Sequence, residues 1–394
     1  MTRIFLSVHG SRLVTDRPNY EPPTVAAWMR TAYRLAMTPR RPPRPRASLF
    51  ITGLVLLLAA IALLFALGLH LDPPVTGHGI AHAQDVPPAF LGPIAAGPDG
   101  NLWFTETEER HIGRITPAGH VTAFPVPRVA GPPSAITRGP DGNLWFTAAR
   151  GIGRITVSGH VTFFRLPRDT QPGAFIISGS DGNLWFTTAG GNGIVRMTVA
   201  GRPQAFHVPE ATSLAPGSDG NLWFTEPRGD AIGRMTLAGR VTEFALPRHK
   251  NQDDASGVGA PITIAAGSDG NLWFTEFARR LGSISPQGRF TEFSLPDRPC
   301  CIPFYITPGP DGNLWFTELY GNGVERITPR GHSVQFVLRT PWSGPLGIAA
   351  GADGNLWVTA TCSNKVVRIT PHGHTTEFPV SARHGTGAYC FRSV

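Results

Sequence analysis

Cysteine is scarce in this chain, which has four among 394 residues: Cys300, Cys301, Cys362 and Cys390. None belongs to a Cys-x-x-Cys pair, and none has a histidine at ligand spacing, so the usual thiolate metal sites are excluded. Four cysteines fit an exported protein. We predict that a disulfide between Cys362 and Cys390 pins a C-terminal tail, residues 381–394, to the folded domain, and the pairing of Cys300 and Cys301 stays open.

The net positive charge is also small once the N-terminal flank is set aside. The formal net charge is +8, and residues 1–47 contribute nine arginines against two acidic residues, or +7, which leaves +1 for the rest. The high pI therefore belongs to the flank and gives no argument for nucleic acid as a partner.

Directly after the flank, residues 48–69 form an uncharged apolar run of 22 residues. As a helix this run would be about 33 Å long, enough to cross the hydrocarbon core of a bilayer. Arginines immediately before it favour a cytosolic N-terminus, so the rest of the chain is expected outside the cytosol, behind a Pro- and Gly-rich linker at 70–89. The alternative is a signal peptide, with Met37 as the start, cleaved near Ala83.

The rest of the chain is dominated by one motif. The stretch GPDGNLWFTE begins at Gly97 and occurs in seven similar copies, with tryptophans at positions 103, 145, 185, 223, 273, 315 and 357. A period near forty residues, with short apolar runs and glycine turns, is typical of β-propeller blades. We predict an all-β protein, a seven-bladed propeller of four-stranded blades over residues 90–380, preceded by one transmembrane helix.

Each motif predicts a turn followed by a buried strand. In the first copy, Asp99 can bond its own backbone and Gly100 can adopt the left-handed conformation that closes a hairpin. The strand Leu102-Trp103-Phe104 does not alternate, which fits a sheet packed on both faces. We expect the tryptophans to fill the space between blades rather than to form a ligand cage. One carboxylate per turn is too few for calcium.

At the level of GPDGNLWFTE, IGRIT and VTEF, the chain resembles the streptogramin B lyase (virginiamycin B lyase) family of seven-bladed propellers. The resemblance implies a lyase that opens the ester-closed ring of a cyclic depsipeptide by elimination, using a magnesium ion and a histidine base. It also implies two histidines and two glutamates in the last two blades. Here those positions carry other residues: Phe304, Gly344, Leu346 and Thr361. We therefore predict no catalytic residues and no cofactor, and magnesium only if the lyase alternative holds.

The remaining connections vary in length and charge, and loops presented by a rigid scaffold are common recognition sites. We expect this face to bind a peptide, glycan or protein, and the chain to be a monomer. The candidate binding residues are Glu106, Glu226, Arg228, Glu276, Arg279, Phe304, Tyr305, Glu318, the Leu319–Tyr320 pair, Trp342 and Leu346.

The glutamates that end the tryptophan strand have two interpretations. They can form cross-strand ion pairs with the arginines of IGR, Arg114 and Arg234 among them, or a carboxylate ring at the mouth of the central channel. The alternative function is a lyase with a relocated catalytic set that includes Glu276, Glu318 and Tyr305.

Overall fold

The computed structural model describes residues 90–247, 260–277, 279–296 and 301–380. The predicted N-terminal segment, membrane helix, linker and C-terminal tail lie outside these residues. No helix within the described ranges is long and apolar enough to span a bilayer.

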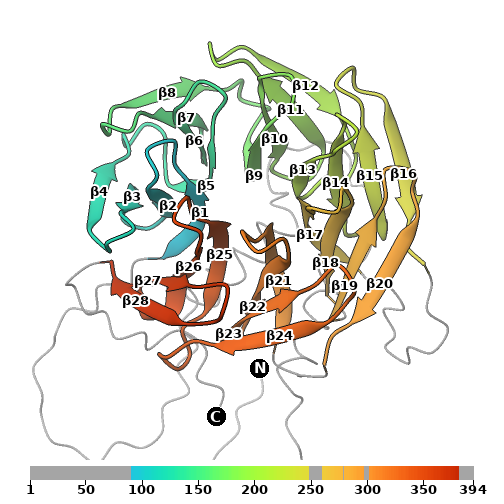
Figure 1. Ribbon diagram of the computed structural model, residues 1–394. Coiled ribbons are helices and arrows are strands. Elements are labelled where there is room, and N and C mark those ends of the chain that lie inside the picture. Colours follow the sequence, from blue (N-terminus) through green and yellow to red (C-terminus); the bar gives the residue numbers. More distant parts are fainter. Residues whose placement is uncertain (1–89, 248–259, 278, 297–300, 381–394) are drawn as a thin grey trace, which may run out of the picture. The chain divides into compact units, whose positions relative to one another are not determined.

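The described chain forms seven four-stranded sheets, each made of consecutive antiparallel strands, which Figure 1 shows as the blades of a propeller. The strands are, in blade 1, β1 (Leu91–Ala96), β2 (Leu102–Glu106), β3 (His111–Ile115) and β4 (Val121–Pro125); in blade 2, β5 (Pro133–Arg138), β6 (Leu144–Ala148), β7 (Gly151–Ile155) and β8 (Val161–Arg165); in blade 3, β9 (Pro172–Ser178), β10 (Leu184–Thr188), β11 (Gly193–Met197) and β12 (Pro203–His207); in blade 4, β13 (Leu214–Pro216), β14 (Leu222–Glu226), β15 (Ala231–Met235) and β16 (Val241–Ala245). They continue, in blade 5, with β17 (Pro261–Ala266), β18 (Leu272–Glu276), β19 (Arg280–Ile284) and β20 (Phe290–Ser294); in blade 6, with β21 (Ile302–Pro308), β22 (Leu314–Leu319), β23 (Gly323–Ile327) and β24 (Ser333–Val337); and in blade 7, with β25 (Pro345–Ala350), β26 (Leu356–Ala360), the 3-10 turn η1 (Thr361–Ser363), β27 (Lys365–Ile369) and β28 (Thr375–Pro379). The all-β, seven-bladed prediction is confirmed.

The tryptophans pack between blades, as predicted. All seven are fully buried. Trp103 of blade 1, for example, lies in one apolar cluster with Leu144 and Phe146 of blade 2. Each indole also stacks on a phenylalanine of its own fourth strand, with ring centroids 5.1–5.6 Å apart. The cage interpretation is therefore wrong.

The motif's aspartate holds its indole in place. The carboxylate of Asp99 accepts hydrogen bonds from Trp103 Nε1 at 3.1 Å and from Asn101 Nδ2 at 2.7 Å. Burial acts to raise the pKa of Asp99, but these hydrogen bonds outweigh it and lower the pKa below its ordinary value. The Asp-Gly-Asn turn is thus a structural clamp in each blade.

The threonine of LWFT joins neighbouring blades. Thr275 Oγ1 accepts from Thr263 N at 3.2 Å in its own blade and donates to Phe304 O at 3.0 Å in the next. Thr359 makes the same bridge from Gly347 N to Gly92 O of blade 1, at 2.9 and 2.8 Å. Blade 7 is completed by its own β28, so the ring closes by side-chain contacts without exchange of a strand.

Candidate functional site

The strand directions divide the connections of the propeller into two rims. The tight-turn rim carries the turns between first and second strands and between third and fourth strands. The variable rim carries the connections from second to third strands and from each blade to the next, and it holds all the candidate binding residues predicted from the sequence.

First strands are irregular where they leave the variable rim. In β21 the pairing with β22 shifts register between Pro303 and Ile306, and β25 shifts likewise between Pro345 and Ile348. Such irregularities redirect side chains and are common next to functional sites. Phe304, Tyr305 and Leu346 occupy these shifted segments.

The redirected side chains form an apolar group that we call the bulge cluster: Ile262, Phe304, Leu319 and Leu346, with Tyr305 and Tyr320 packed against them. Phe304 is 2% exposed and Leu346 4%. Phe304 and Tyr305 meet edge to face at 5.1 Å, and Tyr305 reaches Phe175 of blade 3 at 5.6 Å. Burial raises the pKa of Tyr305, and it raises that of Tyr320 to about 12, so both phenols stay neutral.

The two remaining positions implied by the family resemblance are also built into packing. Gly344 has φ of 59°, and a Cβ there would lie 2.4 Å from Cys362 Sγ. Thr361 Oγ1 donates to Leu91 O at 2.6 Å. Phe304, Gly344 and Leu346 offer no ligating side chain, so these four positions do not fit a magnesium ion.

One of the two cysteines in the predicted disulfide lies in the described part of the chain. Cys362 is disulfide-bonded. Its predicted partner Cys390 lies outside the described residues, as does Cys300, so the pairing stays a prediction. Cys301 is buried at the start of blade 6.

Two of the four predicted glutamates are neutralised by arginines of the same rim. Glu276 Oε2 lies 3.0 Å from Arg280 Nε, and both side chains are buried. Glu318 Oε1 lies 3.6 Å from Arg279 NH2 and also accepts from Gln335. Because Arg279 belongs to blade 5 and Glu318 to blade 6, this pair ties two blades together.

The other two glutamates, Glu106 and Glu226, are 5% exposed and form no salt bridge within the described chain. In each, Oε1 is buried and has no hydrogen-bond partner among the described residues. Burial, with Glu109 nearby, raises the pKa of Glu106 to about 7. Burial, with Glu243 and Glu210, does the same for Glu226. Two of the four glutamates are therefore ion-paired carboxylates and two are carboxyl groups with a raised pKa, so they do not form a uniform ring.

The predicted pairing of these glutamates with the IGR arginines is wrong. In the β2–β3 register Arg114 lies opposite Trp103, not Glu106. Its guanidinium stacks 5.5 Å from the indole centroid and donates to Val157 O of blade 2 at 3.0 Å. In blade 4 the equivalent arginine, Arg234, lies 3.8 Å from the turn carboxylate of Asp219. The arginines thus serve the tight-turn rim.

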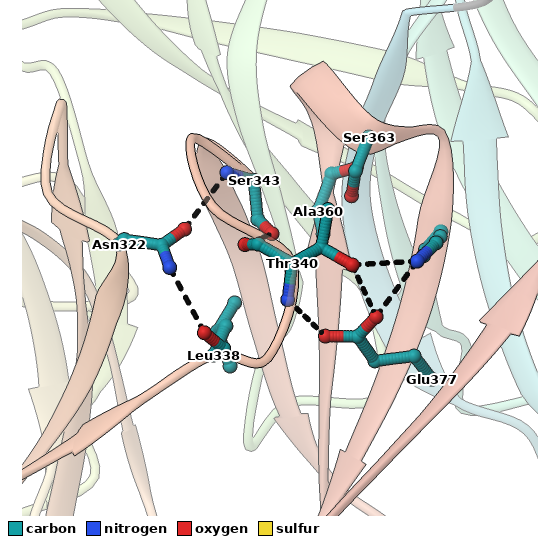
Figure 2. Close-up of polar contacts among 8 residues, drawn as sticks. Asn322, Leu338, Thr340, Ser343, Ala360, Ser363 and Glu377 are labelled. Atoms are coloured by element: carbon teal, nitrogen blue, oxygen red, sulfur yellow. Dashed lines mark hydrogen bonds and ion pairs between the residues drawn. The ribbon is translucent and has the colours of Figure 1, made fainter.

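The loop before β25 presents Trp342, which is 56% exposed and has φ of 58°. A left-handed conformation is costly for an aromatic residue and persists only where neighbours enforce it. Figure 2 shows the enforcing contacts: Glu377 accepts from both N and Oγ1 of Thr340, and Asn322 Oδ1 accepts from Ser343 N at 2.8 Å.

Lys365 completes this clamp, since its Nζ lies 2.8 Å from Glu377 Oε2 and 2.6 Å from Thr340 Oγ1. Hydrogen bonds from Lys365 and Thr340 outweigh burial and lower the pKa of Glu377. Sequence reasoning found Trp342 but missed the clamp, whose members are far apart in the chain. Arg228, the remaining candidate, is exposed on the β14–β15 connection.

Of the described histidines, His111 and His207 lie at the variable-rim ends of β3 and β12, and neither belongs to the bulge cluster. His120, His160, His332 and His374 are exposed on the tight-turn rim, away from the bulge cluster. Across the described residues, no group of three His, Cys, Asp or Glu side chains is arranged to hold a metal ion. In the relocated lyase set, Glu276 and Glu318 are already paired with arginines, and Tyr305 is a partly buried phenol whose pKa is raised.

Comparison with known proteins now defines the class. The profile of the Virginiamycin B lyase family matches residues 74–255 and 176–388. A solved streptogramin B lyase structure is 31% identical, with a TM-score of 0.63 over 70% of this chain and 91% of that one. A catalytically inactive histidine-to-alanine variant of virginiamycin B lyase from Staphylococcus aureus, solved with quinupristin, is 32% identical, with a TM-score of 0.62 over 71% of this chain and 94% of that one.

Curated relatives match over less of their length. Virginiamycin B lyase of Bordetella parapertussis is 45% identical over 51 residues, which is 13% of this chain and 17% of that protein. The fold is that of a seven-bladed propeller of the lyase type. The chain belongs to the Virginiamycin B lyase family.

Proposed function

We propose that this chain is a binding member of its family, which recognises a peptide, glycan or protein through the variable rim and does not open depsipeptide esters. The observation that carries the proposal is the bulge cluster. Phe304 and Leu346 fill the places where the resemblance implies histidines. Both side chains are buried in one apolar cluster with Ile262 and Leu319. Elimination needs a positioned base, and positioned acid–base groups contribute about 10²–10⁴-fold to rates.

The chemistry of the rim favours apolar recognition. The bulge cluster is bordered by Tyr305 and Tyr320, and exposed Trp342 stands two residues before Gly344. Aromatic side chains with a few polar groups are typical of ligand sites and of interface hot spots. The ligand we propose therefore has an apolar side chain or acyl group that can lie on these rings.

The competing candidate is a lyase, which the family membership favours. The two are separated by incubating the full chain with quinupristin and magnesium, and analysing the antibiotic by mass spectrometry. The S. aureus virginiamycin B lyase serves as positive control. We expect the ring to stay closed with this chain and to open with the control, whereas linear product that disappears with chelator would establish the lyase.

We further propose that residues 48–69 anchor the chain in a membrane with the propeller outside the cytosol. The support is the charge-free length of the run and the arginines before it. A reporter fused after Val394 is expected to be exported, and one fused ahead of residue 48 to remain in the cytosol. Reversed labelling would contradict the proposal, and release of a soluble propeller shortened near Ala83 would favour signal cleavage.

A further inference from the structure

The turns between third and fourth strands, here called the outer turns, combine basic residues with a lack of acidic ones. They span residues 116–120, 156–160, 198–202, 236–240, 285–289, 328–332 and 370–374. They contain no aspartate or glutamate. Instead they expose basic side chains and histidines: Arg202, Arg240, Arg289, Arg330, His120, His160, His332, His372 and His374. The last position of every outer turn is Arg or His.

The outer turns are rigid and repeat one geometry. In the first, Thr116 N donates to His120 O at 3.0 Å, and His120 N donates to Thr116 Oγ1 at 3.1 Å. The same pair of bonds closes the turn that ends at Arg240, at 2.9 and 3.1 Å. The backbone of each final residue therefore occupies the same place on its blade.

The outer turns also form a continuous ring. The glycine of each turn lies against a phenylalanine of the preceding blade's fourth strand: a Cβ on Gly159 would be 2.3 Å from the Phe124 ring, and one on Gly119 would be 2.3 Å from the Phe378 ring. The second of these contacts joins blade 1 to blade 7. The outer-turn arginines Arg202, Arg240, Arg289 and Arg330 thus lie on four consecutive blades, 3 to 6, and the outer turns of blades 7, 1 and 2 carry histidines.

Aspartates of the same rim lie in the inner turns, and four of them are already paired with arginines. Asp141, Asp181, Asp219 and Asp311 accept from their tryptophans and lie 3.7–3.9 Å from the IGR-type arginines of their own blades. The outer-turn arginines Arg202, Arg240 and Arg289 are additional to these pairs.

Aliphatic side chains accompany the basic ones. Val157 lies within an outer turn and is 38% exposed, Val241 follows Arg240 and is 36% exposed, and Val334 lies two residues after His332 and is 45% exposed. Basic residues interspersed with exposed aliphatic ones suit the interface of an anionic bilayer, where charge pairs with headgroups and apolar groups enter the boundary.

We propose that the tight-turn rim docks onto a membrane surface containing anionic lipids. An arc of arginines over four consecutive blades, with exposed valines among the outer turns, matches a planar array of phosphates over an apolar boundary. Docking on this rim leaves the variable rim free for its own ligand. The inference is independent of the function proposed above, since it concerns the opposite face.

The test uses the full chain held in nanodiscs of phosphatidylcholine, so that any apolar segment is already accommodated. Separate vesicles, of phosphatidylcholine alone or mixed with phosphatidylglycerol, are added, and co-sedimentation is measured at low and high salt. We expect binding only to the phosphatidylglycerol vesicles, weakened by salt. The triple variant Arg202→Glu, Arg240→Glu, Arg289→Glu should bind at least about tenfold more weakly.

A matched control reverses three exposed arginines of the variable rim, Arg128→Glu, Arg168→Glu and Arg339→Glu, and should bind like the wild type. Thermal melts of both variants establish that each is folded. Equal binding to the two vesicle types, or equal loss in both triple variants, would overturn the proposal. Retention on heparin as strong as on anionic vesicles would overturn the choice of a lipid surface in favour of an anionic polymer.

Discussion

The tight-turn rim and the variable rim come from the same repeats but obey different constraints. On the tight-turn rim each aspartate is bonded to its indole, and most blades also stack an arginine over that indole. A change in any of these residues disturbs two blades, so the copies resemble one another. On the variable rim the equivalent positions differ from blade to blade, so the contacts there are particular to each blade and are not repeated around the ring.

Glutamates sharpen the contrast within the variable rim. Blades 5 and 6 pair theirs with Arg280 and Arg279, whereas blades 1 and 4 bury Glu106 and Glu226 without a basic partner among the described residues. One sequence position thus gives a fixed ion pair in some blades and a weak acid in others. Which of the two forms occurs depends on whether an arginine such as Arg279 or Arg280 lies nearby, and not on the repeated motif.

The largest expected effect separates two tryptophans. Trp223→Ala removes a fully buried indole between blades and should lower the free energy of unfolding by about 3–5 kcal/mol. Trp342→Ala, on the exposed loop, should change it by no more than about 0.5 kcal/mol. Chemical denaturation of the two variants measures both values. Similar losses would show that Trp342 belongs to the core.

A smaller effect separates two glutamates. Glu276→Gln leaves Arg280 buried without its counter-charge and should destabilise the propeller by about 3 kcal/mol. Glu226→Gln replaces a carboxyl that has no counter-charge to lose, and above neutral pH it should be neutral or stabilising. Denaturation at pH 8 compares them. An equal loss in both would mean that Glu226 has a basic partner.

The pH dependence of stability should reflect the same two weak acids. The folded pKa values of Glu106 and Glu226 are about 7, above the ordinary value of 4.5. Between these values the unfolded chain has released protons that the folded chain still holds, so stability falls as pH rises from about 4.5 to about 7. We expect a loss of about 1–3 kcal/mol per group.

The double variant Glu106→Gln, Glu226→Gln is the control for this slope. Its free energy of unfolding, followed from pH 4.5 to pH 8, should depend less on pH than that of the wild type. A double variant with the wild-type slope would assign the effect to other groups.

Much of the fold was predictable because each repeat contains the local signals for its own turns and strands. Turn chemistry, the unbroken LWF strand and the spacing of the tryptophans predicted seven complete blades. The site was less predictable. The Glu106–Arg114 pairing failed because sequence proximity does not give strand register, in which Arg114 faces Trp103. The clamp of Thr340 by Glu377 and Lys365 joins the loop before blade 7 to β27 and β28, which are distant in sequence, so it left no local signal.

The central claim is that no base stands at the bulge cluster, where Phe304 and Leu346 replace the histidines that the resemblance implies. Hydrogen–deuterium exchange into quinupristin tests it directly, because a positioned base would exchange a carbon-bound hydrogen of the antibiotic even if ring opening never finished. The full chain is incubated with quinupristin and magnesium in deuterated buffer, beside S. aureus virginiamycin B lyase, and the mass of the antibiotic is followed. We predict cyclic quinupristin with no more carbon-bound deuterium than in a protein-free sample. Deuterium gain or ring opening that requires this chain would contradict the account.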